Sequence, residues 1–278
     1  MQVGDIVSRN SYKDDILFRI VDIRGDNAML QGVYYRLSAD SPLSDLSIVY
    51  FRHEEDWSQK GMDNRSNLFK KWYVNQTTSY KKTISDDVNE INKAYKRYGR
   101  ILHIDGDDSY LKESLKLYKK LDIPVTALAI QESKQPKYIL ELLLEYKPNI
   151  LVITGHDSMN NSNNYNENIS NYKNSKYFIE TVKIARQYNN NYDDLVIFAG
   201  GCKSYYEGLM EAGANFASSP SRILLHVNDP VLLAYKISTT SVKEYLDVDT
   251  VVEITSVGIN GIGGIETRGQ CREIKPLY

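Results

Sequence analysis

Cysteine is scarce in this chain of 278 residues, which contains only Cys202 and Cys271. Two cysteines cannot form the disulfide framework that is typical of small secreted domains. Histidine is also sparse, at four residues, and neither CxxC nor HExxH, two spacings that mark zinc sites, occurs. We therefore expect no structural metal ion and no cofactor.

Long apolar runs and a large excess of charge are also missing. No apolar run approaches the roughly 20 residues that a membrane-spanning helix needs, and residues 1–5 lack the basic and apolar regions of a signal peptide. The formal net charge of −2 argues against broad electrostatic binding to nucleic acids or acidic membranes. We expect a cytoplasmic protein with no nucleic-acid or membrane partner. The sequence leaves the oligomeric state open.

The chain divides by composition into three regions. Residues 1–53 hold short runs of β-branched and aromatic residues separated by turn formers, which predicts a small β-barrel module, SH3-like in type. Residues 54–99 are polar and predict a helical connector. Residues 100–278 predict an α/β domain. The sequence does not reveal what the N-terminal barrel does.

Apolar strands alternate with helical patterns from residue 100 onward. Mainly apolar runs at 101–104 and 125–130, and continuous apolar runs at 150–153 and 195–199, are separated by segments with helical spacing. Uninterrupted apolar strands in a β-α-β-α-β-α-β order are typical of a parallel sheet that is covered on both faces. The predicted fold class is therefore α/β, with a mostly parallel sheet and helices on both faces.

His156 and Cys202 each follow one of these apolar strands by one to three residues. Side chains at the carboxyl ends of parallel strands meet at one edge of the sheet, where ligands gather. If the two strands are neighbours, the pair can act as nucleophile and base. Taken singly, such a cysteine is more often a buried apolar residue, and such a histidine a hydrogen-bonded structural one. The joint placement favours catalysis.

The residues around Cys202 also suit a thiolate. Residues 204–207 (SYYE) have the pattern of a capping box, which predicts a helix from Ser204 to Gly213. Cys202 would then lie just before a helix N-terminus, where free N–H groups favour a negative sulfur. Gly200 and Gly201 would let the backbone turn sharply and approach a substrate.

The two blocks at residues 150–156 (ILVITGH) and 195–202 (LVIFAGGC) resemble those of the caspase-like clan of cysteine peptidases, which includes caspases, clostripain, gingipains and legumains. Over nearly its full length the chain resembles, more closely still, the sporulation-specific YabG peptidase family. The segments that carry this likeness are 4–9 (GDIVSR), 154–157 (TGHD), 199–202 (AGGC) and 261–268 (GIGGIETR). The resemblance implies a caspase-like fold. It also implies a cysteine endopeptidase that processes spore coat or germination proteins, in the mother cell or associated with the spore.

The resemblance also implies roles for acidic residues near the pair. The clan usually has glycine after the histidine, where its N–H helps to bind the oxyanion, but here Asp157 follows His156. The oxyanion hole would use the backbone N–H groups of Asp157 and Cys202. The acidic loop after the first strand commonly reads the substrate side chain before the cleaved bond, which points to Asp107 or Asp108 and to arginine. The alternative is that these carboxylates only cap a helix.

Two other functions remain open from the sequence. A cysteine hydrolase of small amides would use the same Cys202 and His156. A non-catalytic scaffold for spore assembly would need neither residue. The sequence identifies neither the substrates, nor any activation step, nor a third catalytic residue that orients His156, nor the role of the Asn-rich loop at 159–176.

Overall fold

The computed structural model describes residues 1–49, 95–159 and 168–274. The chain divides into two compact units, Met1–Leu68 and Phe69–Tyr278. Each unit has its own apolar core, so each is described by itself.

The described part of the first unit is an antiparallel five-stranded sheet in the order β4-β3-β2-β1-β5. Apolar side chains from four of its strands form a small separate core. This sheet agrees with the predicted β module, and its SH3-like barrel form stays a prediction. The elements are β1 (Ile6–Arg9), η1 (Asn10–Tyr12), β2 (Leu17–Arg24), β3 (Asn27–Gly32), β4 (Ser38–Pro42), η2 (Leu43–Asp45) and β5 (Leu46–Ile48).

The connector predicted at 54–99 falls mainly on residues 54–94, which lie outside the described residues. Its described end is not helical: β6 (Tyr95–Arg97) pairs antiparallel with β15 (Arg272–Ile274). The helical prediction is wrong at these residues. The backbone hydrogen-bonding groups of β6 are satisfied by β15, which lies near the C-terminal end of the chain. No local pattern in the sequence reveals so distant a partner.

The described part of the second unit is built on a six-stranded sheet in the order β13-β11-β10-β9-β7-β8. The strands from β11 to β8 in this order are parallel, and β13 is antiparallel to β11 at the edge. The predicted mostly parallel sheet is confirmed. The strands are β7 (Ile101–Asp105), β8 (Val125–Ala129), β9 (Ile150–Thr154), β10 (Val196–Ala199), β11 (Phe216–Ser218) and β13 (Ile262–Gly264).

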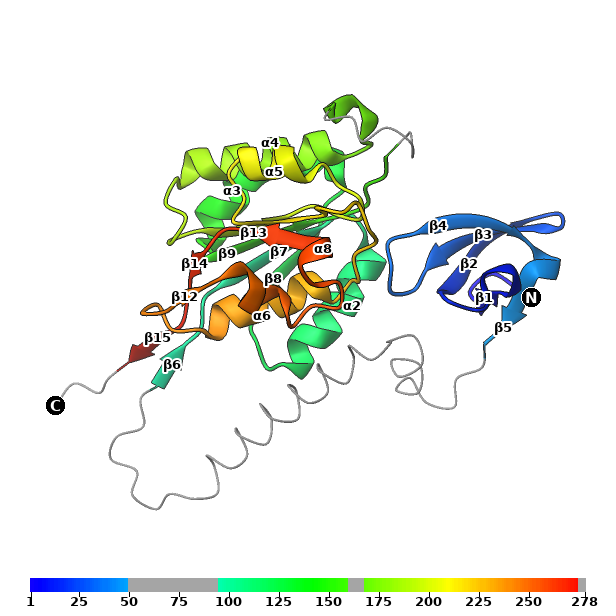
Figure 1. The fold of residues 1–278 in the computed structure, drawn as a ribbon, viewed down its shortest axis with the longest axis horizontal. Coiled ribbons are helices and arrows are strands. Elements are labelled where there is room, and N and C mark those ends of the chain that lie inside the picture. The colour runs from blue at the N-terminus through cyan, green and yellow to red at the C-terminus, as the bar shows by residue number, and fades with distance from the viewer. Residues whose placement is uncertain (50–94, 160–167, 275–278) are drawn as a thin grey trace, which may run out of the picture. The chain divides into compact units, whose positions relative to one another are not determined.

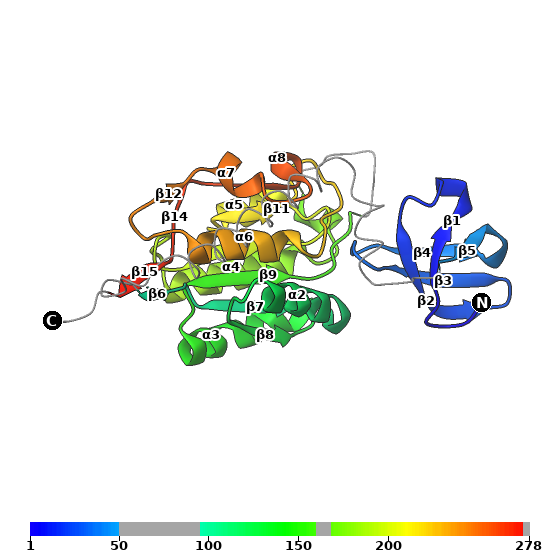
Figure 2. The same ribbon diagram turned by 90° about the horizontal axis from the view of Figure 1, so that it is seen from below.

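Helices cover both faces of this sheet, as predicted (Figures 1 and 2). Alternate side chains of one strand enter opposite cores: Ile150 and Val152 of β9 join one cluster, and Leu151 and Ile153 join the other. On the first face lie α2 (Asp108–Lys120), α6 (Asp229–Thr239) and α7 (Val248–Val252). On the second lie α3 (Gln135–Tyr146), α4 (Ser175–Tyr188) and α5 (Tyr206–Glu211).

Short elements complete the described part of this unit. A two-stranded sheet pairs β12 with β14. Of the Asn-rich loop predicted at 159–176, residues 160–167 lie outside the described residues, and the last two residues belong to α4. None of the described helices is long and apolar enough to span a membrane. The elements are η3 (Glu132–Lys134), η4 (Ile169–Asn171), β12 (Tyr245–Leu246), α8 (Gly258–Gly261) and β14 (Thr267–Arg268).

Candidate functional site

The predicted site residues lie at the carboxyl ends of three consecutive parallel strands. β9 and β10 are neighbours, with Ile153 opposite Ala199. On its other side β9 pairs with β7, with Thr154 opposite Asp105. The loops that carry His156, Cys202 and the acidic residues after β7 therefore leave the same edge of the sheet, as strand polarity requires.

The loops after β9 and β10 are in close contact at Gly201. A Cβ at this position would lie 2.2 Å from the carbonyl oxygen of Gly155 and 3.4 Å from the amide nitrogen of Asp157. No side chain fits in that space. Glycine is thus needed at Gly201 for the two loops to approach, and it brings the main chains beside His156 and Cys202 together.

Cys202 is buried, with 1% of its surface exposed. Its thiol donates to the carbonyl oxygen of Leu225 over 3.7 Å, and the Leu225 N–H donates to Sγ over 3.2 Å. The sulfur is thus enclosed by the main chain of the segment after β11. In this conformation a substrate carbonyl cannot reach Sγ unless that segment moves.

Arg222 anchors the segment that covers Cys202. Its backbone is left-handed, with φ of 54°. Its guanidinium donates to the Tyr172 hydroxyl over 2.8 Å, to Glu207 Oε2, and to the carbonyl oxygen of Ser219 over 3.0 Å. The Arg222 side chain is 9% exposed and that of Glu207 is 52% exposed. One end of this anchor is therefore open to solvent.

The predicted capping box at residues 204–207 is wrong. α5 begins at Tyr206, and no side chain caps it. The Ser204 hydroxyl instead accepts from the Gly201 N–H over 2.9 Å and donates to Asp157 Oδ2 over 3.0 Å. The hydroxyl oxygen thus accepts from the Gly201 N–H rather than from a helix N–H, and its proton goes to the buried carboxylate. The N–H that faces Sγ comes from Leu225 rather than from a helix N-terminus.

The imidazole of His156 lies between two carboxylates. Nε2 is 3.9 Å from Asp107 Oδ2, and Nδ1 is 3.8 Å from Glu132 Oε1. The ring of Tyr110 packs edge-on against it, with centroids 5.4 Å apart. The His156 side chain is 29% exposed. The structure thus brings the His156 and Cys202 loops together but directs their side chains to different partners.

The two acidic residues predicted to read the substrate differ in environment. Asp107 caps α2, because its Oδ1 accepts from the N–H groups of Ser109 over 2.7 Å and Tyr110 over 3.3 Å. Its other oxygen faces His156. Asp108 lies on the exposed surface and pairs with Lys112 over 2.5 Å. Asp107 is therefore the one of the two that borders the site.

Asp157 is almost fully buried, and its carboxylate points into a hydrogen-bonded network. Oδ1 accepts from the N–H groups of Ser158 over 2.9 Å and Asn174 over 2.8 Å. Oδ2 accepts from the hydroxyls of Ser175 and Ser204. Burial raises the pKa of Asp157, and these four hydrogen bonds oppose the rise. The carboxylate joins the β9 loop, the start of α4 and the β10 loop.

Glu132 is a site residue that the sequence reasoning missed. It belongs to η3, three residues after β8, and it is 7% exposed. Its Oε1 accepts from the His156 N–H over 2.6 Å. Like His156 and Cys202, Glu132 is a polar side chain just past a parallel strand, and that pattern could have identified it.

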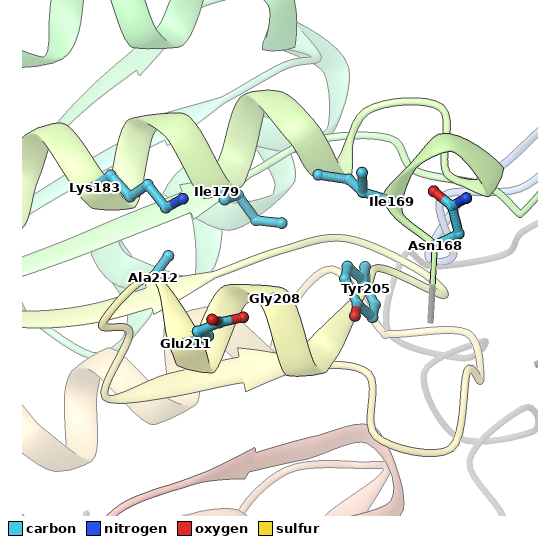
Figure 3. A pocket seen from close by; sticks show the side chains of 8 residues that line it. All are labelled: Asn168, Ile169, Ile179, Lys183, Tyr205, Gly208, Glu211 and Ala212. Carbon is cyan, nitrogen blue, oxygen red and sulfur yellow. The ribbon is translucent and has the colours of Figure 1, made fainter. Parts of the chain in front are cut away.

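A pocket of about 480 Å³ opens between α4 and α5 (Figure 3), and neither His156 nor Cys202 is among the residues that line it. Tyr205 connects it to the site, since its ring stacks on Tyr172 and its N–H donates to the Ser175 hydroxyl. The pocket is lined by Asn168, Ile169, Ile179, Lys183, Tyr205, Gly208, Glu211 and Ala212.

Comparison with known proteins identifies the family. Residues 2–276 match the family model described as YabG peptidase U57. The chain is 41% identical over 281 residues to the sporulation-specific protease YabG of Bacillus subtilis (strain 168), covering 98% of this chain and 96% of that protein. No solved structure matches the chain. With a family match over almost the whole sequence, this chain belongs to the YabG peptidase family.

Proposed function

We propose that this peptidase is a cysteine endopeptidase in which Cys202 is the nucleophile and His156 is the base. The observation that carries the proposal is the contact between the two loops at Gly201, which sets these residues at the ends of adjacent parallel strands. We also propose that the reaction takes place in the α/β domain predicted at 100–278 and that this domain has a caspase-like fold. The N-terminal module is proposed to be an SH3-like barrel.

In the proposed reaction, His156 takes the thiol proton and the Cys202 sulfur attacks the carbonyl carbon of the cleaved bond. The tetrahedral oxyanion accepts hydrogen bonds from the backbone N–H groups of Asp157 and Cys202. The C–N bond then breaks and His156 protonates the leaving amine. Water, giving a proton to His156, hydrolyses the thioester and regenerates the thiol.

The proposed specificity is for arginine before the cleaved bond. Asp107 supports it best, because this carboxylate borders the site and can pair with a guanidinium. Asp108, already paired with Lys112 at the surface, is the weaker of the two. The biological role that we propose follows the relative's name: processing of spore coat or germination proteins in the cytoplasm of a sporulating cell, or associated with the spore.

The proposed function is tested by incubating purified protein with arginyl, lysyl and aspartyl fluorogenic peptides, with and without iodoacetamide. We expect cleavage of the arginyl peptide and its loss after alkylation. Cleavage that survives full alkylation of Cys202 would contradict the cysteine mechanism. Turnover of small amides alone would favour an amidase.

The burial of Cys202 favours one competing function, a non-catalytic scaffold for spore assembly. A scaffold predicts that no peptide or protein is cleaved, including when the segment over Cys202 has been loosened. The same peptide assay with Glu207→Gln, the variant that loosens this segment, therefore separates the scaffold from a latent enzyme.

Loosening the Arg222 anchor is expected to speed alkylation of Cys202. Glu207→Gln removes the charge that holds the guanidinium. Because Glu207 is largely exposed, the gain should be no more than roughly fivefold. The rate is measured by mass spectrometry of the Cys202 peptide. Asp193→Asn, which breaks the pair with Arg268 in another region, is the matched control and should change nothing. Wild-type Cys202 that reacts as fast when native as in urea would contradict the enclosed thiol.

A further inference from the structure

We infer that Glu132 is the positioning residue for His156, fixing its main chain and the direction of its ring. The inference rests on the proposed function, because it assigns the third role in a reaction carried out by Cys202 and His156. Three observations support this role: the position of the Glu132 carboxylate, the space that two glycines leave for it, and its negative charge.

The Glu132 carboxylate contacts both the backbone and the ring of His156. One oxygen, Oε1, accepts from the His156 N–H over 2.6 Å and lies 3.8 Å from Nδ1. The same oxygen thus faces the backbone nitrogen and the ring Nδ1 of His156. A proton held on Nδ1 by this carboxylate leaves the lone pair of Nε2, the nitrogen that faces Asp107, to accept the thiol proton.

The ends of two strands leave room for this carboxylate. A Cβ at Gly106, directly after β7, would lie 2.1 Å from Glu132 Oε1. A Cβ at Gly155, directly after β9, would lie 2.6 Å from the same oxygen. Glycine at both positions therefore creates the space that Glu132 fills. The carboxylate enters from η3 and reaches His156 across the end of β7.

The carboxylate is held in its charged form. Burial raises the pKa of Glu132, but the contacts with His156 outweigh burial, and the net pKa lies below the ordinary value for glutamate. A charged carboxylate beside the ring favours the imidazolium that forms after proton transfer. From α2, Asp107 also faces the ring at Nε2 and Tyr110 packs against it. Any pH effect must therefore be separated from that of Asp107.

The test is Glu132→Gln in the full-length protein. Glutamine keeps the length and an oxygen for the His156 N–H but removes the charge. We expect kcat to fall roughly 10- to 100-fold with little change in KM, because the group acts on proton transfer. The acid limb of the pH profile of kcat/KM should move to lower pH, since the imidazolium loses a favourable neighbour. Asp107→Asn should act mainly on the KM of arginyl peptides. Wild-type kcat and an unchanged pH profile in Glu132→Gln would overturn the inference.

A second measurement keeps this inference separate from the proposed function. The ring signals of His156 in protein labelled at histidine report its titration by NMR without any cleavage. A midpoint that moves to lower pH in Glu132→Gln, and stays in place in the exposed Glu141→Gln, supports the positioning role even if no peptide is cut. An unchanged midpoint in Glu132→Gln would overturn it even if peptides are cut. Partial recovery of kcat in Glu132→Asp, whose carboxylate is one methylene shorter, is also expected.

Discussion

Replacing Cys202 by alanine is expected to lower kcat/KM for peptide cleavage by about 10⁴-fold or more, because no other group can form the thioester. The fold should survive, since alanine keeps the Cβ and removes the sulfur, which contacts the Leu225 main chain. A loss of about 1 kcal/mol in unfolding free energy is expected for such a change. Urea unfolding, followed by circular dichroism, measures this loss in the same preparation that is assayed.

Cys271→Ala is the matched control. Cys271 is also buried, but it begins the segment that leads into β15, where it bridges to Ser241. Burial raises the pKa of its thiol, so the nucleophilic thiolate is disfavoured there. This variant should cleave at the wild-type rate. Full activity in a folded Cys202→Ala protein, or activity lost in Cys271→Ala instead, would show that Cys202 is not the nucleophile.

The apolar strands and their order were predictable because each depends on local sequence. Runs such as 150–153 and 195–199 are continuous, and a sheet buried on both faces needs that pattern. The placement of His156 and Cys202 followed from strand polarity alone, since parallel neighbours present their carboxyl ends together. Strand polarity therefore predicted that the two residues leave the same edge of the sheet once their strands are neighbours, as β9 and β10 are.

The interactions that the sequence concealed are long-range. Ser204 has the local pattern of a cap, but its hydroxyl donates to Asp157, 47 residues earlier. Leu225 covers Cys202 through main-chain groups, which every residue except proline possesses, so no side-chain pattern marks it. Glu132 resembles an ordinary acidic residue near a helix start, and only the folded loop brings His156 to it. Each is a tertiary contact that overrides a local preference.

The resemblance to the caspase-like clan predicts a glycine where this chain has Asp157, and a carboxylate there poses an electrostatic problem for the proposed reaction. A carboxylate next to an oxyanion donor would repel the developing negative charge. The structure turns it away: Asp157 is bound by Ser158, Asn174, Ser175 and Ser204. Its side chain therefore joins the β9 loop, the start of α4 and the β10 loop, and its main-chain N–H stays at the position proposed for oxyanion binding.

Asp157→Ala is accordingly expected to cost roughly 3 to 5 kcal/mol in unfolding free energy, because two buried hydroxyls and two partly buried N–H groups lose their acceptor. Asp157→Asn should cost less, since the amide oxygen still accepts from the N–H groups of Ser158 and Asn174. The two variants are compared by urea unfolding, and cleavage is assayed at a temperature where both are folded. We expect kcat to fall in both, because the Ser204 hydroxyl that holds Gly201 loses its charged partner.

The pH dependence of stability separates this role from a simple loss of packing. Burial raises the folded-state pKa of Asp157 above its unfolded value, so its contribution to stability is full below the unfolded pKa and is lost as pH rises through the folded pKa. Asp157→Asn cannot titrate and should lack this decline, so its deficit relative to wild type should shrink as pH rises through the same range. A deficit that stays constant with pH would show that Asp157 titrates alike in the folded and unfolded chains. The four hydrogen bonds to the carboxylate would then fully offset the cost of burying its charge.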